Sequence, residues 1–176
     1  MEKKCCFTGY RPCKLEYLQN EGSAAYKKLY ATLQKTVIEA TEQGYNYFIS
    51  GFAEGVDLMA AEIILNLKRE GYDLFLEAAL PAMNQANTMD NATKGIYFML
   101  LDRADRRVCI EQSMNKYSCL KRDDYMVKEA DLVIAVFDGE KGGTAYTIGK
   151  ARQKKRNLWL INPRDYTITR EEGLFL

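Results

Sequence analysis

The sequence predicts an α/β fold of three layers, with helices on both faces of a mainly parallel, doubly wound sheet. Strand-like and helix-like segments alternate along almost the whole chain, as in proteins whose parallel strands are joined by crossover helices. The strand-like segments are short apolar runs, and the clearest is the β-branched run at 131–137. Two strands are each followed by a glycine-bearing turn and then a helix. No linker, repeat or low-complexity tract appears, so residues 1–176 are predicted to form a single domain.

The predicted strands are bounded by turn-forming residues. Gly9 follows the first strand, and Pro81 is expected to end the third. Residues 164–176 are predicted to be a short tail without a strand. In chain order, the predicted strands cover residues 4–8, 45–50, 72–80, 107–111, 131–137 and 157–161.

The predicted helices carry apolar residues at helical spacing. In the first, Leu29, Leu33 and Val37 share one face, and Gly44 suits the position just past the helix end. The segment 84–103 is helical only in its second half, where apolar residues recur at this spacing. The other predicted helices cover residues 23–43, 54–70, 119–129 and 144–156.

The composition indicates a globular protein without a strong net electrostatic field. Apolar residues make up 47% of the chain and charged residues 28%, and the net charge is 25 − 24 = +1. A chain so close to neutrality is not drawn as a whole to nucleic acid or to a membrane. The longest apolar runs have six residues, far too few to span a bilayer, so we expect a soluble protein without a membrane partner.

The cysteine and histidine content limits the catalytic mechanisms that this protein can use. The five cysteines are odd in number and include no Cys-x-x-Cys pair, which is typical of a reduced chain, so we expect a cytoplasmic location. The chain contains no histidine. This excludes Ser-His-Asp, Cys-His and zinc-hydrolase mechanisms, and no metal site is expected.

The first glycine-bearing turn lies between the strand 45–50 and the next helix. Gly51 and Gly55 allow positive φ angles or the close approach of another group. A helix that begins at such a turn points free N–H groups and its positive dipole end toward the turn, which is a site for an anion such as phosphate. Asp57, in the first helical turn, suits the dipole or faces a ligand. An ordinary packing turn is the alternative.

The second glycine-bearing turn, 138–144, has the same arrangement, and Thr144 suits a helix cap or a phosphate-binding hydroxyl. Arg11, after the first strand, can clamp a phosphate or carboxylate. Ligands of open parallel sheets bind beyond the carboxyl ends of the strands, so these three loops are expected to converge. Together with Arg122 in the helix 119–129, the candidate ligand-binding residues are Thr8, Gly9, Arg11, Ser50, Gly51, Glu54, Gly55, Asp57, Arg122, Asp138, Gly142, Gly143 and Thr144.

Four motifs in order resemble the SLOG superfamily, a Rossmann-like three-layer αβα group that holds the Smf/DprA DNA-processing proteins and the cytokinin-activating LOG proteins. They are TGYRP at 8–12, SGFAEGVDLMAAE at 50–62, KRDDYMV at 121–127 and GEKGGT at 139–144. Within this superfamily the chain looks most like the YpsA-like family. The resemblance implies a pocket for a nucleotide or a nucleotide-derived small molecule, in which Gly51, Glu54 and Gly55 are functional positions. The resemblance implies that no cofactor is required besides this nucleotide-like ligand.

Two departures weigh against the better-known members of the superfamily. LOG-type hydrolases end the second glycine motif with GGxGTxxE, whereas Thr147 stands here where the catalytic glutamate belongs. DprA-like proteins carry Arg-Asn in the later motif, whereas this chain has Arg122-Asp123, and an added acid repels a phosphate backbone.

Three functions follow from these patterns. The first is binding or sensing of a nucleotide-like small molecule. The second is an enzyme, such as an N-glycosidic hydrolase, with a carboxylate as the base; its catalytic residue is not identified by the sequence. The third is DprA-like binding of single-stranded DNA, with Tyr10, Tyr117 and Tyr125 as stacking residues. Whether the protein is an enzyme, and whether it forms a homo-oligomer, the sequence leaves open.

Overall fold

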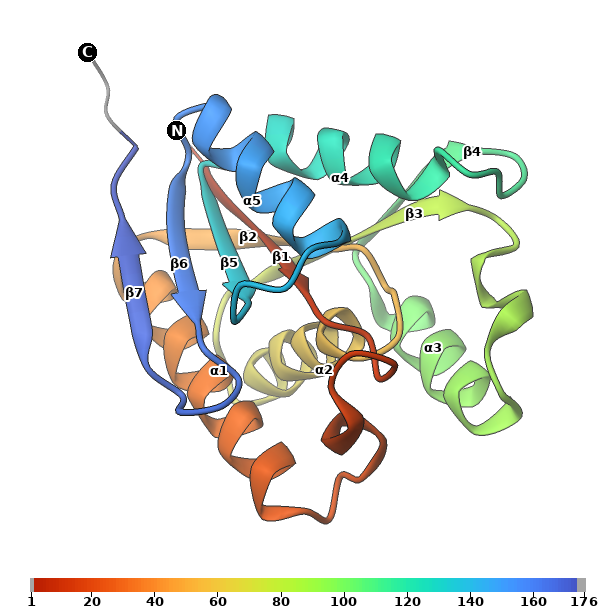
Figure 1. Ribbon diagram of the computed structural model, residues 1–176, viewed down its shortest axis with the longest axis horizontal. Coiled ribbons are helices and arrows are strands. Elements are labelled where there is room, and N and C mark those ends of the chain that lie inside the picture. Colours follow the sequence, from red (N-terminus) through yellow and green to blue (C-terminus); the bar gives the residue numbers. More distant parts are fainter. Residues whose placement is uncertain (1, 174–176) are drawn as a thin grey trace.

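A computed structural model describes residues 2–173, and its centre is a seven-stranded sheet in the order β4-β3-β2-β1-β5-β6-β7 (Figure 1). Every neighbouring pair is parallel except β6 and β7, which are antiparallel. The strands are β1 (Lys3–Gly9), β2 (Tyr45–Ser50), β3 (Phe75–Ala82), β4 (Arg106–Glu111), β5 (Leu132–Val136), β6 (Asn157–Ile161) and β7 (Ile168–Glu171). The predicted three-layer, Rossmann-like α/β fold with a doubly wound sheet is confirmed.

Helices cover both faces of this sheet (Figure 1). The first three α-helices pack on one face, and the last two on the other. The helices are α1 (Ala24–Glu42), α2 (Val56–Arg69), α3 (Asn91–Arg103), α4 (Ser118–Glu129) and α5 (Gly143–Gln153), with short 3-10 helices η1 (Glu16–Gln19) and η2 (Gln85–Thr88). No helix within residues 2–173 combines the length and the apolar composition needed to cross a membrane.

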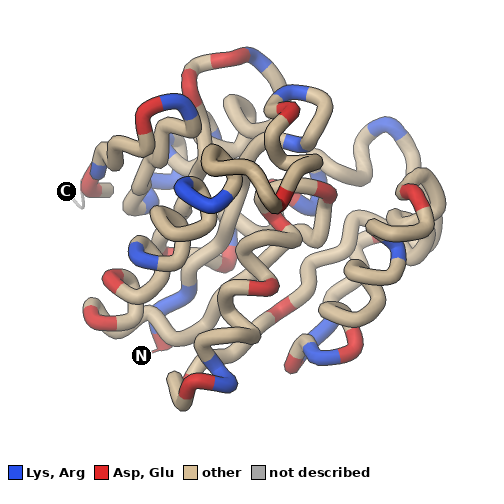
Figure 2. The backbone as a smooth tube through the Cα atoms, turned by 90° about the horizontal axis from the view of Figure 1, so that it is seen from below, with Lys and Arg blue, Asp and Glu red and all other residues tan. Residues whose placement is uncertain are grey.

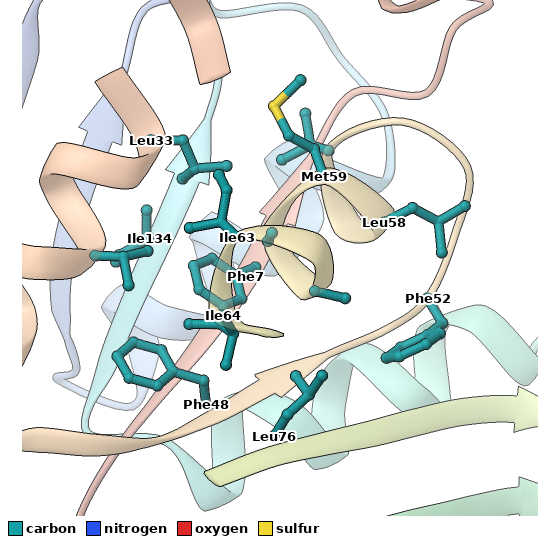
Figure 3. Close-up of a cluster of buried hydrophobic side chains, with 14 of the residues drawn as sticks. Phe7, Leu33, Phe48, Phe52, Leu58, Met59, Ile63, Ile64, Leu76 and Ile134 are labelled. Carbon is teal, nitrogen blue, oxygen red and sulfur yellow. The ribbon is translucent and has the colours of Figure 1, made fainter. Parts of the chain in front are cut away.

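The larger core lies between α2 and the central strands. Phe7 of β1 stacks on Phe48 of β2, with ring centroids 5.8 Å apart. Ile63 and Ile64 of α2 are completely buried in the same cluster, beside Leu76 of β3 (Figure 3). Burying side chains of this size stabilises the fold by about 1.5–3 kcal/mol each. This core fixes the height of α2 above the sheet, and so the position of the turn that precedes the helix.

A close contact between β1 and α2 determines where α2 begins, near the carboxyl end of the sheet. A Cβ added to Gly9 would stand 2.6 Å from Cβ of Val56, the first residue of α2. The Val56 N–H donates to the carbonyl of Tyr10 at 3.3 Å. Glycine at position 9 is therefore required for the helix to start directly against the first strand.

Three sequence-based predictions about strands were wrong. First, β3 begins at Phe75 and not at residue 72. Pro81 does not end β3, which continues to Ala82. The neighbouring β2 ends at Ser50, opposite Ala78, so Pro81 has a partner strand on one side only, where a missing N–H is tolerated. The expected tail contains β7, which pairs with β6. Its short, charged sequence gave no strand pattern, and residues 174–176 of that tail lie outside the described range.

We predict opposite effects for two Gly→Ala substitutions. Gly9→Ala should lower the free energy of unfolding by about 1–3 kcal/mol, because the added methyl group collides with Val56. Gly149→Ala on α5 should raise it by about 0.5–1 kcal/mol, because no atom lies within 4 Å of the added Cβ and alanine favours the helix. Urea denaturation of both variants beside the unmodified protein checks this. Equal effects of the two substitutions would contradict it.

Candidate functional site

The candidate site is a cavity of about 160 Å³ at the carboxyl end of the sheet, where β1 and β5 diverge into loops on opposite sides. Its walls come from the loop after β1, the turn before α2, the first turns of α4 and the start of α5. This is the edge at which the sequence predicted convergence. Of the candidate residues, the cavity is lined by Thr8, Gly9, Arg11, Asp57, Arg122, Gly143 and Thr144.

The other candidate residues support the walls or face elsewhere. Ser50 donates its hydroxyl hydrogen to the carbonyl of Asp57 at 2.8 Å and accepts from the N–H of Phe52 at 3.2 Å. Phe52 has a φ of 54°, so the Ser50 hydroxyl helps to hold a strained turn in place. Glu54 does not line the 160 Å³ cavity but lines two other cavities.

Both glycines of the first turn permit close approaches. A Cβ on Gly51 would stand 2.3 Å from Nη1 of Arg122, and a Cβ on Gly55 would stand 2.5 Å from the carbonyl oxygen of Tyr10. Gly55 also has a φ of 90°. These contacts account for both glycines through packing, and a direct role in ligand binding stays a prediction.

Arg122 is the buried centre of the site, with a relative exposure of 4%. Its Nη1 donates to the carbonyl of Gly51 at 2.5 Å, and its Nε donates to Oδ1 of Asp123 at 2.7 Å. Burial works to lower the pKa of the guanidinium, but the charges of Asp123 and Asp57 outweigh burial and raise it. Arg122 therefore remains a fixed positive charge between two carboxylates.

The two carboxylates beside Arg122 both border the cavity. Burial raises the pKa of Asp57 to about 6, although Arg122 acts in the opposite direction. Burial also raises the pKa of Asp123, again against the influence of Arg122. Oδ2 of Asp57 accepts from the N–H of Ala53 at 3.3 Å. Both carboxyl groups can accept a hydrogen bond from a ligand, and Asp57, with a pKa of about 6, can also exchange a proton near neutral pH.

The second glycine-bearing turn is held by Tyr10 from the opposite loop. The Tyr10 hydroxyl donates to Oδ1 of Asp138 at 2.5 Å and accepts from the N–H groups of Asp138 and Glu140. Nε of Arg164 donates to the other carboxylate oxygen of Asp138 at 2.6 Å. Asp138 is thus engaged in fixing the turn and does not line the cavity.

The N-terminus of α5 opens toward the cavity. The residue before it, Gly142, has a φ of 147°, and no side chain caps the first N–H groups of the helix. Gly143 and Thr144 begin the helix and line the cavity. Gly142 itself lies under the Lys14 ammonium, which would be 2.6 Å from an added Cβ. Unsatisfied N–H groups at a helix start, with the dipole behind them, favour an anion.

Two site residues were missed by sequence reasoning, Lys14 and Cys119. Lys14 donates to the carbonyl of Lys141 and lies 3.3 Å from Oε1 of Glu140, so it bridges the loop after β1 to the turn before α5. Cys119 accepts a hydrogen bond from Nη2 of Arg11, with the atoms 3.6 Å apart. No spacing in the sequence indicates either contact, because each joins segments more than 100 residues apart.

Two further cavities are present, and only the smaller one shares lining residues with the first. One, of about 240 Å³, shares Arg11, Cys13, Ala53 and Cys119 with it and is also bordered by residues of η2. The other, of about 620 Å³, runs between the loop after β1, α2 and α3. All the ionisable side chains that line this larger cavity are acidic or tyrosine, namely Glu21, Tyr26, Glu54, Glu62 and Asp90. The described residues contain no group of three His, Cys, Asp or Glu side chains placed to hold a metal ion.

We predict that Asp57 makes the stability of the protein depend on pH. Its pKa is raised on folding from 3.8 to about 6, so its protonated form favours the native state below pH 4, and this contribution is lost as the pH rises through 6. The loss should be on the order of 2–3 kcal/mol. Asp57→Asn should flatten this decline between pH 4 and 7 in chemical denaturation experiments. The exposed Asp102→Asn is the control, and an unchanged pH profile in Asp57→Asn would refute the assignment.

Comparison with solved structures finds DNA-processing proteins of the same fold. The DprA protein of Streptococcus pneumoniae aligns with 92% of this chain at a TM-score of 0.64 and 17% identity, and this chain spans half of its length. The DprA protein of Helicobacter pylori, whose structure is described as showing a single-stranded DNA binding mode, aligns with 97% of this chain at a TM-score of 0.61 and 19% identity. At these identities the likeness establishes the shared fold.

Comparison of sequences finds nearer relatives. A UPF0398 protein of Bacillus cereus (strain ATCC 14579) is 28% identical over 162 residues, which cover 89% of this chain and 85% of the relative. A UPF0398 protein of Bacillus thuringiensis (strain Al Hakam) gives the same identity and coverage. The model of the YpsA family, described as the YspA SLOG family, matches residues 5–166. This match takes in all four motifs and both glycine-bearing turns, and the chain therefore belongs to the YpsA family of SLOG proteins.

Proposed function

We propose that this protein binds a nucleotide-derived small molecule in the 160 Å³ cavity. The observation that carries the proposal is that the uncapped start of α5, Arg11 and Lys14 border one cavity from two separate loops. Backbone N–H groups, a guanidinium and an ammonium together form a site for a phosphate group.

The carboxylates on the other side of the cavity suit a sugar. Asp57 and Asp123 present acceptor oxygens to the space that Thr8 also borders. Acidic side chains bind ribose hydroxyls in many nucleotide sites, because a carboxylate accepts hydrogen bonds from neighbouring hydroxyl groups. A phosphate at α5 and a pentose at these two residues would together fill the cavity.

The adjoining 240 Å³ cavity is the place for a base. The first cavity alone is below the range of about 300–1,000 Å³ that is usual for small-molecule sites, and the two cavities share four lining residues. Met89 and Met114 offer apolar surface there for a base. The cleft formed by both suits a mononucleotide better than a dinucleotide.

An enzymatic role at the same site has one observation in its favour, the pKa of Asp57. A carboxyl group that titrates near pH 6 is suited to general acid or base catalysis at neutral pH. Turnover of the bound nucleotide, with release of its base, would place the protein among N-glycosidic hydrolases.

Single-stranded DNA binding is the second candidate, and the fold shared with the H. pylori DprA favours it. The charge distribution favours it less. Basic and acidic residues are interspersed along the chain (Figure 2), and the net charge is +1. A DNA-binding surface would show affinity that falls steeply with salt.

We predict that Arg11→Met weakens the binding of adenosine 5′-monophosphate about 10- to 100-fold, because it removes a charge-assisted hydrogen bond to phosphate. Binding of adenosine, which lacks the phosphate, should change little. Isothermal titration calorimetry with both ligands, together with native mass spectrometry, measures this. Arg103→Met, at the exposed end of α3, is the matched control.

The same titrations separate the three functions. Free base appearing in the nucleotide sample identifies the enzymatic role. Salt-dependent binding of an oligothymidylate without nucleotide binding identifies the DNA-binding role. Equal affinity of Arg11→Met and Arg103→Met for the nucleotide would refute the site.

A further inference from the structure

The helix α3 lies at the periphery of the molecule and turns an apolar face to solvent (Figure 1). Ile96, Phe98 and Met99 of this helix have relative exposures of 39%, 52% and 46%. Gly95 is exposed on the same face, and a Cβ added to it would meet no atom within 4 Å. Aromatic residues and methionine are enriched at protein interfaces, and glycine lets another surface approach closely. The face of α3 is therefore suited to a contact with another protein.

The exposed residues of α3 form two neighbouring rows, because residues three or four apart lie together on a helix. The first row is Ala92, Ile96, Met99 and Arg103, and the second is Asn91, Gly95, Phe98 and Asp102. The first row lies beside the 620 Å³ cavity, because Ala92 and Ile96 line that cavity and no residue of the second row does.

The 620 Å³ cavity carries negative charge without a cation to balance it. Its lining includes Glu21, Glu54, Glu62 and Asp90 but no lysine or arginine. None of these four carboxylates forms an ion pair with another described residue. Burial and the charge of Glu21 raise the pKa of Glu62, although Arg69 acts in the opposite direction. Such a cavity favours a cationic group from outside the chain.

Arg103 is a cation at the opposite end of α3 from Asp90. It is exposed, and it forms no ion pair within residues 2–173. At about 1.5 Å per residue it stands roughly 20 Å along the helix from Asp90, so it does not reach that carboxylate in its own chain. Antiparallel pairing of two α3 helices would bring Arg103 of one copy to the Asp90 end of the other.

The exposed face of α3 is complementary to itself in this antiparallel arrangement. A two-fold axis at the level of Tyr97 sets Met99 of each copy over Gly95 of the other, because these residues lie equally far on either side of Tyr97. The long methionine side chain then fills the space that the glycine leaves open. Phe98 meets Phe98 of the second copy on one side of the contact, and Ile96 meets Ile96 on the other.

The same axis brings opposite charges together at both ends of the contact. Arg103 comes level with Asn91 of the second copy, between Asp90 and Ala92, and on the side where Ala92 lines the acidic cavity. Asp102 comes level with the neutral Asn91 and Ala92 of the second copy, so no two like charges are opposed in the contact. An acidic cavity that meets an unpaired arginine at a fixed position favours this partner and this register.

We propose that two copies of this chain form a symmetric dimer by antiparallel packing of their α3 helices, in which Arg103 of each copy enters the acidic 620 Å³ cavity of the other. The nucleotide cavity takes no part in this contact, because no residue of α3 lines it. A contact based on one helix from each copy is at the small end of stable interfaces, so the dimer forms at micromolar protein concentrations.

The oligomeric state tests the proposal. Sedimentation equilibrium of the full-length protein should give a concentration-dependent mass that approaches twice 20.2 kDa. Met99→Glu places a charge over Gly95 of the second copy and should raise the dimer dissociation constant at least about 10-fold. Met83→Glu is the matched control, because Met83 is 72% exposed and lies outside α3, and it should leave the dimer unchanged.

The charge contact is tested separately. Arg103→Glu adds an acid to an acidic cavity and should also raise the dissociation constant at least about 10-fold. Lys154→Glu, at the exposed end of α5, is the matched control. Circular dichroism checks that each variant is folded. A monomer at all concentrations, or a dimer that survives both Met99→Glu and Arg103→Glu, would overturn the proposal. So would binding of oligolysine to a protein that stays monomeric, which would assign the cavity to a basic segment of another protein.

The register has its own test, in a chain that carries Cys13→Ser and Cys109→Ser and so lacks its two fully exposed thiols. Diamide accepts two electrons and two protons from a pair of thiols and leaves a disulfide. Phe98→Cys in this chain should therefore give a covalent dimer, because the two copies of residue 98 meet beside the axis. Tyr72→Cys, at an exposed position outside α3, should not. Equal cross-linking of the two variants, or none through residue 98, would contradict the pairing about Tyr97.

Discussion

The guanidinium of Arg122 is the interaction on which the candidate site depends. It comes from α4, on one face of the sheet, and reaches the turn that leads into α2, on the other face. Its partners include a backbone carbonyl and two acids, so its burial is compensated in both charge and hydrogen bonding. Removing one of these groups would leave the others buried without a partner. The stability of the first glycine-bearing turn therefore depends on the position of α4. Charged and hydrogen-bonding contacts of Arg122 therefore hold together the parts of the site that come from the two faces of the sheet. Apolar packing of the helices on the sheet determines where these parts lie.

The fold was largely predictable from the sequence, because it follows from the local pattern of apolar residues. Alternating strands and helices imply parallel pairing, and parallel pairing implies one ligand-binding edge; the convergence of Thr8, Arg11, Asp57 and Thr144 at one cavity follows from topology. The prediction about Pro81 was wrong because a proline's effect depends on whether a neighbouring strand is present, and the sequence does not state where β2 ends. The strand β7 was missed because its few residues are held by pairing with β6 and by ion pairs, not by an apolar run.

Roles within the site were less predictable than its location. Gly51 and Gly55 were singled out correctly as positions that require glycine, but the groups that approach them are Arg122 and the Tyr10 carbonyl of this same chain. Asp138 follows a buried strand as a ligand-binding acid would, yet its oxygens are engaged by Tyr10 and Arg164. Lys14 and Cys119 enter the site only through contacts between distant segments. Sequence spacing indicates which backbone reaches the edge of the sheet, whereas side-chain partners depend on the packed structure.

The position of β1 has a consequence for how the protein is made. It is the central strand, and its two neighbours are separated by most of the chain: β2 follows soon after it, whereas β5 begins at Leu132. On a ribosome that adds about 5–20 residues per second, the interval between the end of β1 and the arrival of β5 is roughly 6–25 seconds. During that time the first four strands and their three helices can assemble as a half-sheet, with Cys5, Cys6 and Phe7 presenting an unpaired apolar edge. The nascent chain thus passes through a stage in which β1, the central strand of the finished sheet, is an exposed edge strand. A chaperone that shields strand edges would bind β1 at this stage.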